Sequence, residues 1–551
     1  MCRKHSLAHV FFLFLFTATT FAQSEKVDAI FAQWDKPDSP GCALGVIKDG
    51  QLIYQRGYGM ANLEHNIPIT ADTVFYIAST SKQFTAMNIA LLAQQGKISL
   101  DDDIRKLIPE FPRYEHIVTI RHLVHHTSGL RDFFMLMPMA GQLLEDIHSE
   151  QEVIELLARQ KQLESTPGAK FAYNNSGYFL LGVIVRRVTG KSLRQFSEES
   201  FFAPLGMKST HYHDNHTEII KNRATGYVPH PQKKFAIFAT NFELVGDGGV
   251  MTTITDIARW DQNFYTGKAG GMNTIHQALT AGKLNDGRPQ DYAFGLFLRT
   301  YKGLKRVDHG GIYNGFRADL IRFPEQKFSV ACLCNLYNID VSKLAEKVAD
   351  VYLADQFKAS TDEAKKTAFI ELSDAELKPY TGTYYDPLKG NTWAFSINDN
   401  KLTGKPMGAS FLYAKFSPLT QKQFVSLAPA PAVEVEFNDR AAFIKAFGNE
   451  PTKFILAEAF VPMINQLREY AGNFFSEELQ VNWQLEVKDD KLYLFYRNYA
   501  AKPLLPTVKD NFSGDNMNLI FIRDAQQKII GFKVNSIVRD LSNLAFTRIG
   551  N

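Results

Sequence analysis

Ser79 and Lys82 are one helical turn apart in the segment Ser79-Thr80-Ser81-Lys82, and of all residue pairs in this sequence they are the best suited to covalent chemistry. The pattern predicts a helix start here, with both side chains on one face and free backbone N–H groups that can meet an anion. A hydroxyl needs a base to become a nucleophile, and a desolvated lysine can lose its proton. Alone, the tetrapeptide is often a chance pairing of a helix-capping serine with a surface lysine.

A second motif, Tyr173-Asn174-Asn175, lies in a loop that enters a predicted helix. A phenol and a carboxamide two residues apart can point to one side of a binding site. The phenol of Tyr173 can relay protons, and the amide of Asn175 can hydrogen-bond a substrate amide or ester. Taken singly, the motif is a polar turn that caps a helix.

A third motif, His309-Gly310-Gly311, precedes a predicted strand. Its two glycines let the backbone approach a ligand closely. The N–H that follows Gly311, that of Ile312, could supply half of an oxyanion hole. Taken singly, the motif is an ordinary glycine-rich turn.

In this order, Ser-x-x-Lys, Tyr-x-Asn and His-x-Gly resemble the three-part signature of the penicillin-recognising serine hydrolases, the family of penicillin-binding proteins and class C β-lactamases. The flanking stretches 126–130, 204–210 and 246–250 also resemble the class C-like branch. The resemblance spans about residues 27–355. It implies an enzyme that acts through an acyl-enzyme intermediate and uses no metal or other cofactor.

The resemblance also implies a role for each motif residue. Ser79 would attack a carbonyl, Lys82 and Tyr173 would move protons, and which of these two is the acylation base stays open. Asn175 would orient the substrate. The N–H groups of Ser79 and Ile312 would hold the oxyanion.

His309 stands where many members of that family have a lysine that binds the substrate carboxylate. A histidine is mostly neutral at pH 7, so the positive charge is weakened. His309 and Gly311 are still expected to contact the substrate. Arg317 could restore a charge, although an ordinary strand-edge residue is the simpler interpretation. The substitution points away from β-lactamase or carboxypeptidase activity and toward the esterase and D-aminopeptidase relatives.

The elements around the motifs predict an α+β domain, in which an antiparallel sheet is flanked by helices. Residues 43–54 form a predicted hairpin around Asp49-Gly50, and residues 318–333 form a second one around Pro324-Glu325. Between them, apolar residues recur at helical spacing after Phe84 and after Tyr178.

The C-terminal part contains an internal repeat. Leu377–Gly382 resembles Leu467–Gly472, and Trp393 resembles Trp483, at a constant offset of 90 residues. We expect two copies of one small antiparallel β-barrel, each opening with a Leu-x-x-Tyr-x-Gly strand. A catalytic domain followed by two such barrels resembles the architecture of bacterial D-aminopeptidase.

The expected organisation follows from these boundaries. It comprises a signal peptide (1–22), a catalytic domain (23–357), a linker (358–372), a first barrel (373–460) and a second barrel (461–551). The signal peptide is predicted from Arg3 and Lys4, a short apolar run and small residues ending at Ala22. No later segment is long and apolar enough to span a membrane, so we expect a periplasmic or secreted protein.

Composition excludes some partners and leaves other questions open. A formal charge of +3 on 551 residues gives no reason to expect nucleic acid. Cys42, Cys332 and Cys334 are expected to be buried free thiols, with a bridge from Cys42 to either of the others as the alternative. His211, His213 and His216 gather around Asp214, but without a metal-binding spacing we expect no metal there.

The sequence therefore predicts an exported serine hydrolase of small esters, amides or D-amino-acid-containing peptides. The alternative within the same class is a D,D-peptidase, penicillin-binding protein or weak β-lactamase that meets peptidoglycan fragments. A non-catalytic sensor of peptidoglycan or β-lactams is the alternative from another class.

Overall fold

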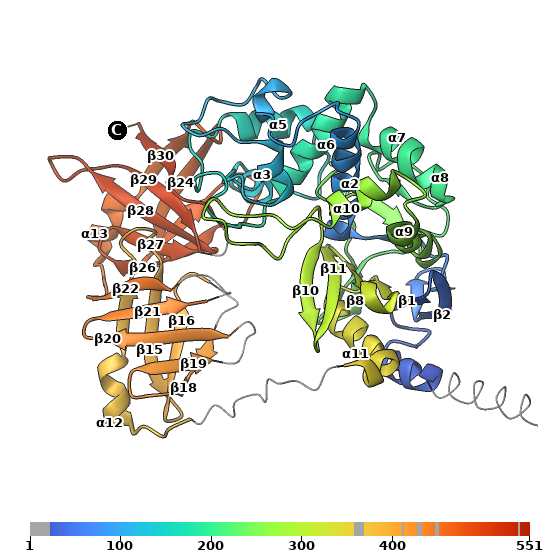
Figure 1. The fold of residues 1–551 in the computed structure, drawn as a ribbon. Coiled ribbons are helices and arrows are strands. Elements are labelled where there is room, and N and C mark those ends of the chain that lie inside the picture. The colour runs from blue at the N-terminus through green and yellow to red at the C-terminus, as the bar shows by residue number, and fades with distance from the viewer. Residues whose placement is uncertain are drawn as a thin grey trace, which may run out of the picture. The chain divides into compact units, whose positions relative to one another are not determined.

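The computed structural model describes residues 23–357, 369–409, 413–426, 432–446, 451–537 and 540–550. The expected signal peptide (1–22) and most of the expected linker (358–372) lie outside these residues. The described chain forms two compact units (Figure 1). The first comprises residues up to 130, 144–158 and 165–357, and the second comprises 131–143, 159–164 and the residues from 369 onward. The expected domain boundaries remain predictions.

The first unit is built on a six-stranded antiparallel sheet. Its strands are β1 (Cys42–Lys48), β2 (Gln51–Tyr58), β10 (Phe297–Tyr301), β11 (Leu304–Tyr313), β12 (Phe316–Phe323) and β13 (Phe328–Cys334). They lie in the order β10-β11-β12-β13-β1-β2. The β1–β2 turn has positive φ at Asp49 and Gly50, as an Asp-Gly hairpin requires. Both predicted hairpins are confirmed.

Helices cover both faces of this sheet, because side chains alternate along each strand. Leu44 of β1 belongs to one apolar core with Leu344 and Val348 of α11 (Val341–Leu353). A side chain at Gly45, on the opposite face, would meet Ile254 of α9 (Ile254–Thr266). The expected α+β architecture, a sheet flanked by helices, is confirmed (Figure 1).

The remaining elements of the first unit form a mostly helical layer and small sheets. The helices are α2 (Lys82–Gln94), α3 (Ile120–Val124), α5 (Glu150–Ala158), α6 (Asn175–Thr189), α7 (Leu193–Ser197), α8 (Ala203–Leu205) and α10 (Gly271–Ala278). The short strands are β3 (Met60–Asn62), β4 (Ile67–Pro68), β5 (Phe75–Tyr76), β6 (His211–Tyr212), β7 (Tyr227–His230), β8 (Lys234–Ile237) and β9 (Val250–Thr252). Strands β5, β9 and β6 make a three-stranded sheet beside the start of α2.

The second unit holds two barrel-like sheets. The first consists of β14 (Gly382–Tyr385), β15 (Thr392–Asn398), β16 (Lys401–Pro406), β17 (Ala414–Lys415), β18 (Ser417–Pro418), β19 (Gln423–Ser426), β20 (Val433–Asn438), β21 (Ala441–Lys445) and β22 (Thr452–Ala457). Its order is β17-β16-β15-β14-β22-β21-β20-β19-β18, and only Phe416 separates the two end strands in sequence. The sheet is therefore nearly closed.

The second sheet is a closed barrel in sequence order. Its strands are β23 (Gly472–Ser476), β24 (Val481–Lys488), β25 (Lys491–Phe495), β26 (Lys502–Val508), β27 (Asn511–Gly514), β28 (Met517–Arg523), β29 (Ile529–Ser536) and β30 (Leu544–Ile549). Closure by the β23–β30 pairing leaves no free sheet edge. Two small antiparallel barrels were expected, and this part of the fold is confirmed.

The two sheets repeat the same local structure at the predicted offset. Tyr384 is paired with Trp393 in the first, and Phe474 with Trp483 in the second. One detail of the prediction is wrong, because the Leu-x-x-Tyr segments are helical rather than extended. They lie in α12 (Asp374–Leu377) with the 3-10 turn that follows it, and in α13 (Ile464–Tyr470). The first strand of each copy begins only at the glycine.

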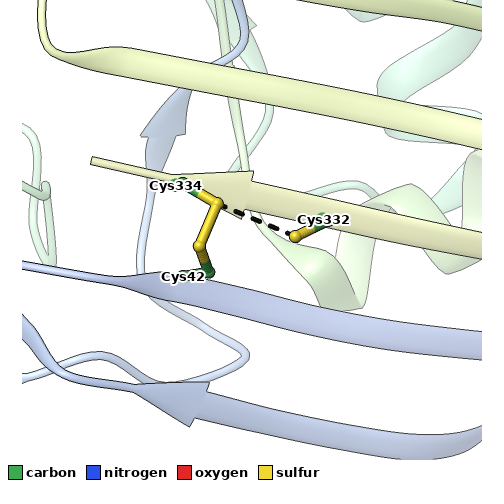
Figure 2. Close-up of side chains that lie close together, drawn as sticks. All are labelled: Cys42, Cys332 and Cys334. Carbon is green, nitrogen blue, oxygen red and sulfur yellow. Dashed lines mark hydrogen bonds between the residues drawn. A yellow bond between two sulfur atoms is a disulfide. The ribbon is translucent and has the colours of Figure 1, made fainter. Parts of the chain in front are cut away.

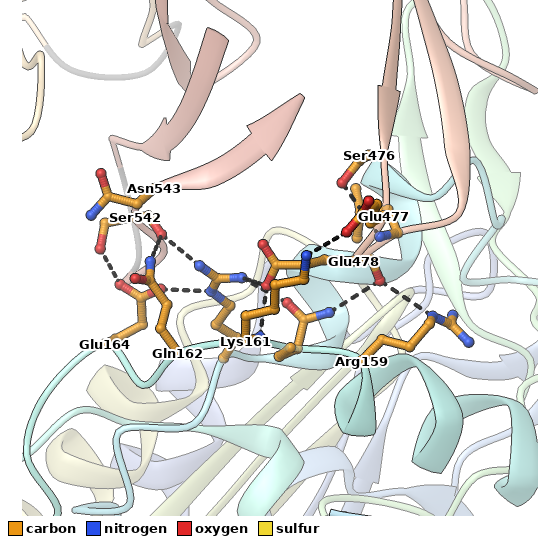
Figure 3. A network of polar contacts seen from close by, with 12 residues as sticks. Arg159, Lys161, Gln162, Glu164, Ser476, Glu477, Glu478, Ser542 and Asn543 are labelled. Carbon is orange, nitrogen blue, oxygen red and sulfur yellow. Dashed lines mark hydrogen bonds and ion pairs between the residues drawn. The ribbon is translucent and has the colours of Figure 1, made fainter. Parts of the chain in front are cut away.

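Two segments from the middle of the sequence, 131–143 and 159–164, belong to the second unit. The first contains α4 (Phe133–Met139), and the carbonyl of Met139 accepts a hydrogen bond from Trp483 Nε1 at 3.0 Å. Arg131 is 1% exposed and donates to the carboxylates of Glu164 at 2.8 Å and Glu478 at 2.7 Å. Figure 3 shows these two glutamates within the network of polar contacts. A buried network of ion pairs thus fastens these segments to the closed barrel.

The cysteines give a different result from the one expected. Cys42 and Cys334 face each other on β1 and β13 and form a disulfide (Figure 2). Cys332 keeps a buried thiol, and its Sγ lies 3.7 Å from that of Cys334. The expectation of free thiols is wrong for two of the three, because only the strand register could reveal which cysteines are opposite. No helix among the described residues is long and apolar enough to cross a bilayer.

Candidate active site

Ser79 lies in a 3-10 turn, Ala78–Ser81, that joins β5 to α2. Ala78, just before it, has a φ of 47°, a left-handed conformation that is unfavourable for an alanine. Backbone strain of this kind persists only where the surrounding fold fixes the residue. The turn therefore holds Ser79, which is half-buried, in a defined position at the N-terminal end of α2.

Lys82 is the first residue of α2 and is completely buried. Its Nζ lies 3.2 Å from Ser79 Oγ, 2.9 Å from Asn175 Oδ1 and 2.5 Å from the backbone carbonyl of Asp247. The structure thus brings the Ser-x-x-Lys and Tyr-x-Asn motifs together at Lys82. The carbonyl of Asp247 was not predicted to bind Lys82, although the glycine-rich Gly246–Gly249 segment had pointed to that loop.

The contacts of Lys82 suit a group that exchanges a proton. A protonated lysine has three N–H donors, and here three oxygens receive them. A neutral amine could keep its two N–H donors on Asn175 and Asp247 and accept the proton of Ser79. No carboxylate forms an ion pair with Lys82 among the residues that the structure describes, so no counter-ion fixes the lysine in its charged form.

Asn175 begins α6, and Asn174 caps that helix by accepting from the Gly177 N–H at 2.9 Å. The Asn174 Nδ2 also donates to the carbonyl of Leu130 at 2.6 Å. A capped helix start has few backbone alternatives. This local order directs the Asn175 side chain to Lys82.

Tyr173 presents its ring rather than its hydroxyl to Lys82, with Nζ 5.0 Å from the ring centroid. Its hydroxyl is buried and has no hydrogen-bond partner among the described residues. The ring packs against His126 at a centroid distance of 4.4 Å. His126 Nδ1 accepts from the Asn174 N–H at 3.1 Å, and burial together with the charge of Lys82 holds the pKa of His126 well below its usual value. His126 therefore packs as a neutral ring behind the motif residues.

His309 is 2% exposed and lies in β11. Its Nδ1 donates to the carbonyl of Gly310 at 2.7 Å, and its Nε2 accepts from the Tyr292 hydroxyl at 3.1 Å. Burial, and secondarily the charge of Lys82, lowers the pKa of His309 to about 3. The side chain is a neutral imidazole at pH 7, so it carries no charge for a substrate carboxylate.

The edge of β11 beyond His309 is where a substrate carbonyl could meet backbone donors. Strand β10 pairs with β11 only as far as Asp308, and past that point the Ala78–Ser81 turn packs on β11. A side chain at Gly311 would come 2.1 Å from the carbonyl of Ile77, so only glycine fits. The side chain of Ile312 is 68% exposed. The predicted residues Gly311 and Ile312 therefore lie beside the turn that carries Ser79.

Arg317 does not supply the charge that His309 lacks. Its Nη1 donates to the carbonyls of Phe316 at 2.7 Å and Asn314 at 3.3 Å, and its guanidinium lies 4.3 Å from the centroid of the Tyr337 ring. These contacts order the β11–β12 turn. Arg317 is thus a structural strand-edge residue, the simpler of the two interpretations of the sequence.

Comparison with known proteins identifies the family of this chain. The family model described as Beta-lactamase matches residues 27–353, more than half of the chain. Penicillin-binding protein 4* of Bacillus subtilis (strain 168) is 29% identical over 70% of this chain and 88% of its own length. The D-aminopeptidase of Gluconobacter oxydans (strain 621H) is 25% identical over 80% of each chain.

Solved structures agree on the fold. The octameric penicillin-binding protein homologue from Pyrococcus abyssi superposes with a TM-score of 0.55 and 21% identity, covering 87% of this chain and 99% of that one. The D-amino acid amidase from Ochrobactrum anthropi SV3, in complex with L-phenylalanine, has a TM-score of 0.52 and 23% identity, covering 60% and 98%.

Proposed function

The chain belongs to the β-lactamase family and is a serine hydrolase, and from this premise we propose that it cleaves small esters, amides or D-amino-acid-containing peptides through an acyl-enzyme on Ser79. The observation that carries the proposal is the contact of buried Lys82 Nζ with Ser79 Oγ at 3.2 Å, beside Asn175. A nucleophile within reach of its base is what covalent acyl transfer needs.

In the proposed reaction, neutral Lys82 takes the Ser79 proton as Oγ bonds to the substrate carbonyl carbon. The carbonyl oxygen becomes an oxyanion, which the N–H groups of Ser79 and Ile312 stabilise. When the oxyanion collapses, the bond to the leaving amine or alcohol breaks, and that group takes up a proton through Lys82 or the Tyr173 hydroxyl. Water then attacks the ester on Ser79 and releases the acid and the free serine.

Of the two candidate bases, we assign the acylation step to Lys82. Its Nζ contacts Ser79 Oγ directly, whereas Tyr173 turns its ring toward Lys82. The unpartnered Tyr173 hydroxyl remains available to pass a proton to the leaving group. Asn175 would have two roles: its side chain holds Lys82, and it would also orient the substrate amide or ester.

The substrate class is inferred from the two residues that could have bound a substrate carboxylate, His309 and Arg317. His309 is neutral and Arg317 is engaged in its own turn, so neither favours a substrate that must be held by a carboxylate. A substrate whose reactive group is an ester, an amide or the amide of a D-amino acid does not need that contact. The similarity to proteins named D-aminopeptidase supports this choice.

A D,D-peptidase or weak β-lactamase that acts on peptidoglycan fragments is the second candidate. It is favoured by the similarity to a penicillin-binding protein over 88% of that relative. A non-catalytic sensor is the least favoured, because the serine, lysine, tyrosine and asparagine of the motifs are all present.

We also propose that the protein is exported to the periplasm or secreted. The Cys42–Cys334 bridge supports this location, because structural disulfides persist in oxidising compartments and are rare in the cytosol. Determining the N-terminus of the protein from its native host tests the proposed cleavage after Ala22. A mature N-terminus at Gln23 is expected, and an intact Met1 in the cytosolic fraction would contradict export.

The mass of the intact protein after incubation with a fluorophosphonate tests the nucleophile. We expect one adduct on the wild type and none on Ser79→Ala. A panel of D- and L-amino-acid amides, simple esters and a penicillin then separates the candidates. Turnover of the D-amides or esters supports the proposed substrates, whereas lasting penicilloylation of Ser79 favours the cell-wall peptidase. If the folded protein forms no adduct, the hydrolase proposal fails and the non-catalytic sensor becomes the preferred function.

A further inference from the structure

A second cluster of chemically able side chains lies on β6 and the loop that follows it. His211 and His213 are two residues apart in an extended segment, so both point to the same side. Tyr212, between them, is buried on the other side. Two histidines at positions i and i+2 of a strand can bring two ring nitrogens to one point.

Glu218 completes a set of three possible ligands. One ring nitrogen of His211, one of His213 and one carboxylate oxygen of Glu218 all lie within 4.8 Å of one another. Ligand atoms of a tetrahedral zinc ion with Zn–N distances of about 2.0–2.1 Å are about 3.3 Å apart. Small side-chain rotations would therefore close the set around one ion.

The second observation is that one buried ring nitrogen of each imidazole lacks a hydrogen-bond partner among the described residues. His211 Nε2 and His213 Nδ1 are buried and receive no hydrogen bond from any described residue. His213 is only 4% exposed. A buried polar atom without a partner is costly, and a bound cation would satisfy two of them at once. Glu218 is partly exposed, which leaves an entry path.

Two arginines near the three possible ligands affect cation binding in opposite ways. Arg194 binds both oxygens of Glu218, at 2.7 and 2.8 Å, and its Nη1 also lies 3.1 Å from Asp214. Each carboxylate oxygen has a second lone pair, and ligating carboxylates are commonly held by outer hydrogen bonds. The charge of Arg194 is balanced by two acids. The charge of Arg223 acts on His213, and no acid among the described residues is paired with it, so Arg223 lowers the affinity for a cation.

We propose that His211, His213 and Glu218 form a binding site for a borderline divalent transition metal, with zinc as the best match. Two imidazoles and one carboxylate suit Zn²⁺ or Co²⁺, whereas Mg²⁺ and Ca²⁺ prefer oxygen ligands alone. Water would take the fourth position.

This proposal revises the sequence-based expectation of no metal in the region. Two members of the cluster seen in the sequence do not take part: the His216 ring contacts Glu243, and Asp214 is not among the residues whose ligand atoms lie within 4.8 Å of one another. The carboxylate that matters, Glu218, was not among them. It is brought to the histidines by the loop after β6.

The role of such a metal would be structural. The cluster shares no residue with the Ser79–Lys82 site, but β6 pairs with β9, and the His213 N–H donates to the carbonyl of Gly249 at 2.7 Å. Gly249 is two residues from Asp247, whose carbonyl binds Lys82. A metal would thus fasten the strand next to the loop that holds the lysine. The proposal stands independently of the hydrolase activity.

Isothermal titration of the untagged protein with Zn²⁺ tests the site, with Co²⁺ as a spectroscopic probe. Reductant is omitted, because it would free the cysteines near Cys332. We expect one Zn²⁺ per chain, a higher melting temperature with Zn²⁺, and visible d–d absorption with Co²⁺. His211→Gln and Glu218→Gln should each weaken binding by more than about 100-fold, above the 10–100-fold typical for loss of an outer partner.

The matched control is His216→Gln, a histidine on the same segment that lies outside the set. It should keep wild-type zinc affinity. Far-UV circular dichroism confirms that each variant is folded, and Glu218→Gln, which is partly exposed, remains informative if a histidine variant unfolds. Absence of a one-to-one zinc complex, or equal zinc affinity in the two ligand variants and the wild type, would overturn the proposal.

Discussion

Lys82 in the first compact unit and Arg131 in the second are both withdrawn from solvent, yet their surroundings differ in kind. Lys82 meets a hydroxyl, an amide oxygen and a backbone carbonyl, all neutral. Arg131 meets two carboxylates, the amide oxygen of Gln160 and the carbonyl of Ser542. Burying a charge is expensive unless it is paired or can be given up.

The contrast separates a cation that holds the fold from one that can do chemistry. Arginine side chains remain charged in proteins, and two carboxylates together with the acceptors of Gln160 and Ser542 make the burial of Arg131 stable. The neighbours of Lys82 are instead kept neutral: burial and the lysine's own charge lower the pKa of His126 and that of His309. Among the described residues Lys82 therefore contacts neutral oxygens only, including the hydroxyl of Ser79 with which it would exchange a proton.

The largest expected effect is on the Lys82 side of the comparison. Lys82→Arg keeps a buried cation but cannot act as a base, so kcat/KM should fall about 10³-fold or more, as for other members of a nucleophile–base unit. Lys82→Met should lose as much activity while remaining folded, because no anion is left unpaired. Steady-state kinetics with the best ester or amide, alongside urea denaturation, measures both.

Ser79→Ala provides the reference for this test, since it removes the nucleophile itself. The double variant Ser79→Ala/Lys82→Met should be no slower than either single variant. If Lys82→Arg retained a tenth of wild-type activity, the lysine would be a structural cation like Arg131, and Tyr173 would become the leading base.

The next largest effect is on the Arg131 side. Arg131→Met leaves Glu164 and Glu478 buried without their partner, and breaking such a network costs about 3–5 kcal/mol. We expect a loss of that size in the free energy of unfolding of the second unit. Urea denaturation monitored by the fluorescence of Trp483, which is buried in the closed barrel, should report it.

The triple variant Arg131→Met/Glu164→Gln/Glu478→Gln is the matched control, because it removes the cation and both charges together. It should regain most of the lost stability. A single variant as stable as the wild type would mean that the ion pairs do not fasten segments 131–143 and 159–164 to the barrel.

An intermediate effect is expected on the free energy of unfolding as a function of pH. It tests whether His309, next to Lys82, stays uncharged in the folded protein. Between pH 7 and 5 the unfolded chain protonates His309, whose ordinary pKa is 6.5, while the folded chain, with a pKa of about 3, does not. The unfolded state binds more protons, so stability falls as pH falls. His309 alone should account for roughly 2 kcal/mol over this range.

The measurement is the free energy of unfolding of the wild type and of His309→Gln at both pH values. The variant should show the smaller loss. Asp319 works in the opposite direction, because burial raises its pKa to about 6, but it does so equally in both proteins. Equal pH dependence in the two proteins would show that His309 takes up its proton in the folded state.

Much of the catalytic side of this comparison is predictable from sequence, because its information is local. The Ser79–Lys82 spacing and the Asn174 cap before Asn175 each follow from a few neighbouring residues. Gly311 could be read from the sequence too, but what requires a glycine there, the carbonyl of Ile77, is distant along the chain. The repeated barrels were equally visible, since the offset of 90 residues between Trp393 and Trp483 reflects one strand register used twice.

The parts that sequence did not predict all depend on long-range contacts. Any residue has a backbone carbonyl, so nothing marks that of Asp247 as a partner of Lys82. Arg131 and Glu478 are 347 residues apart, and only the folded chain brings them together. The same holds for the Cys42–Cys334 bridge, which requires the register of β1 on β13.

The smallest expected effect comes from an ion pair beside the Arg131 network. Lys161 contacts Glu477 next to Glu478 (Figure 3), but these side chains are 64% and 70% exposed. Water and salt screen such a pair, and ordering two long side chains offsets its attraction. Lys161→Ala should therefore leave the urea midpoint of the second unit unchanged within error, at low and at high salt. A clear loss of stability in Lys161→Ala that disappears at high salt would mean that charge near the barrel stabilises it whether or not it is buried. In that case, burial would not be what distinguishes Arg131 from its neighbours.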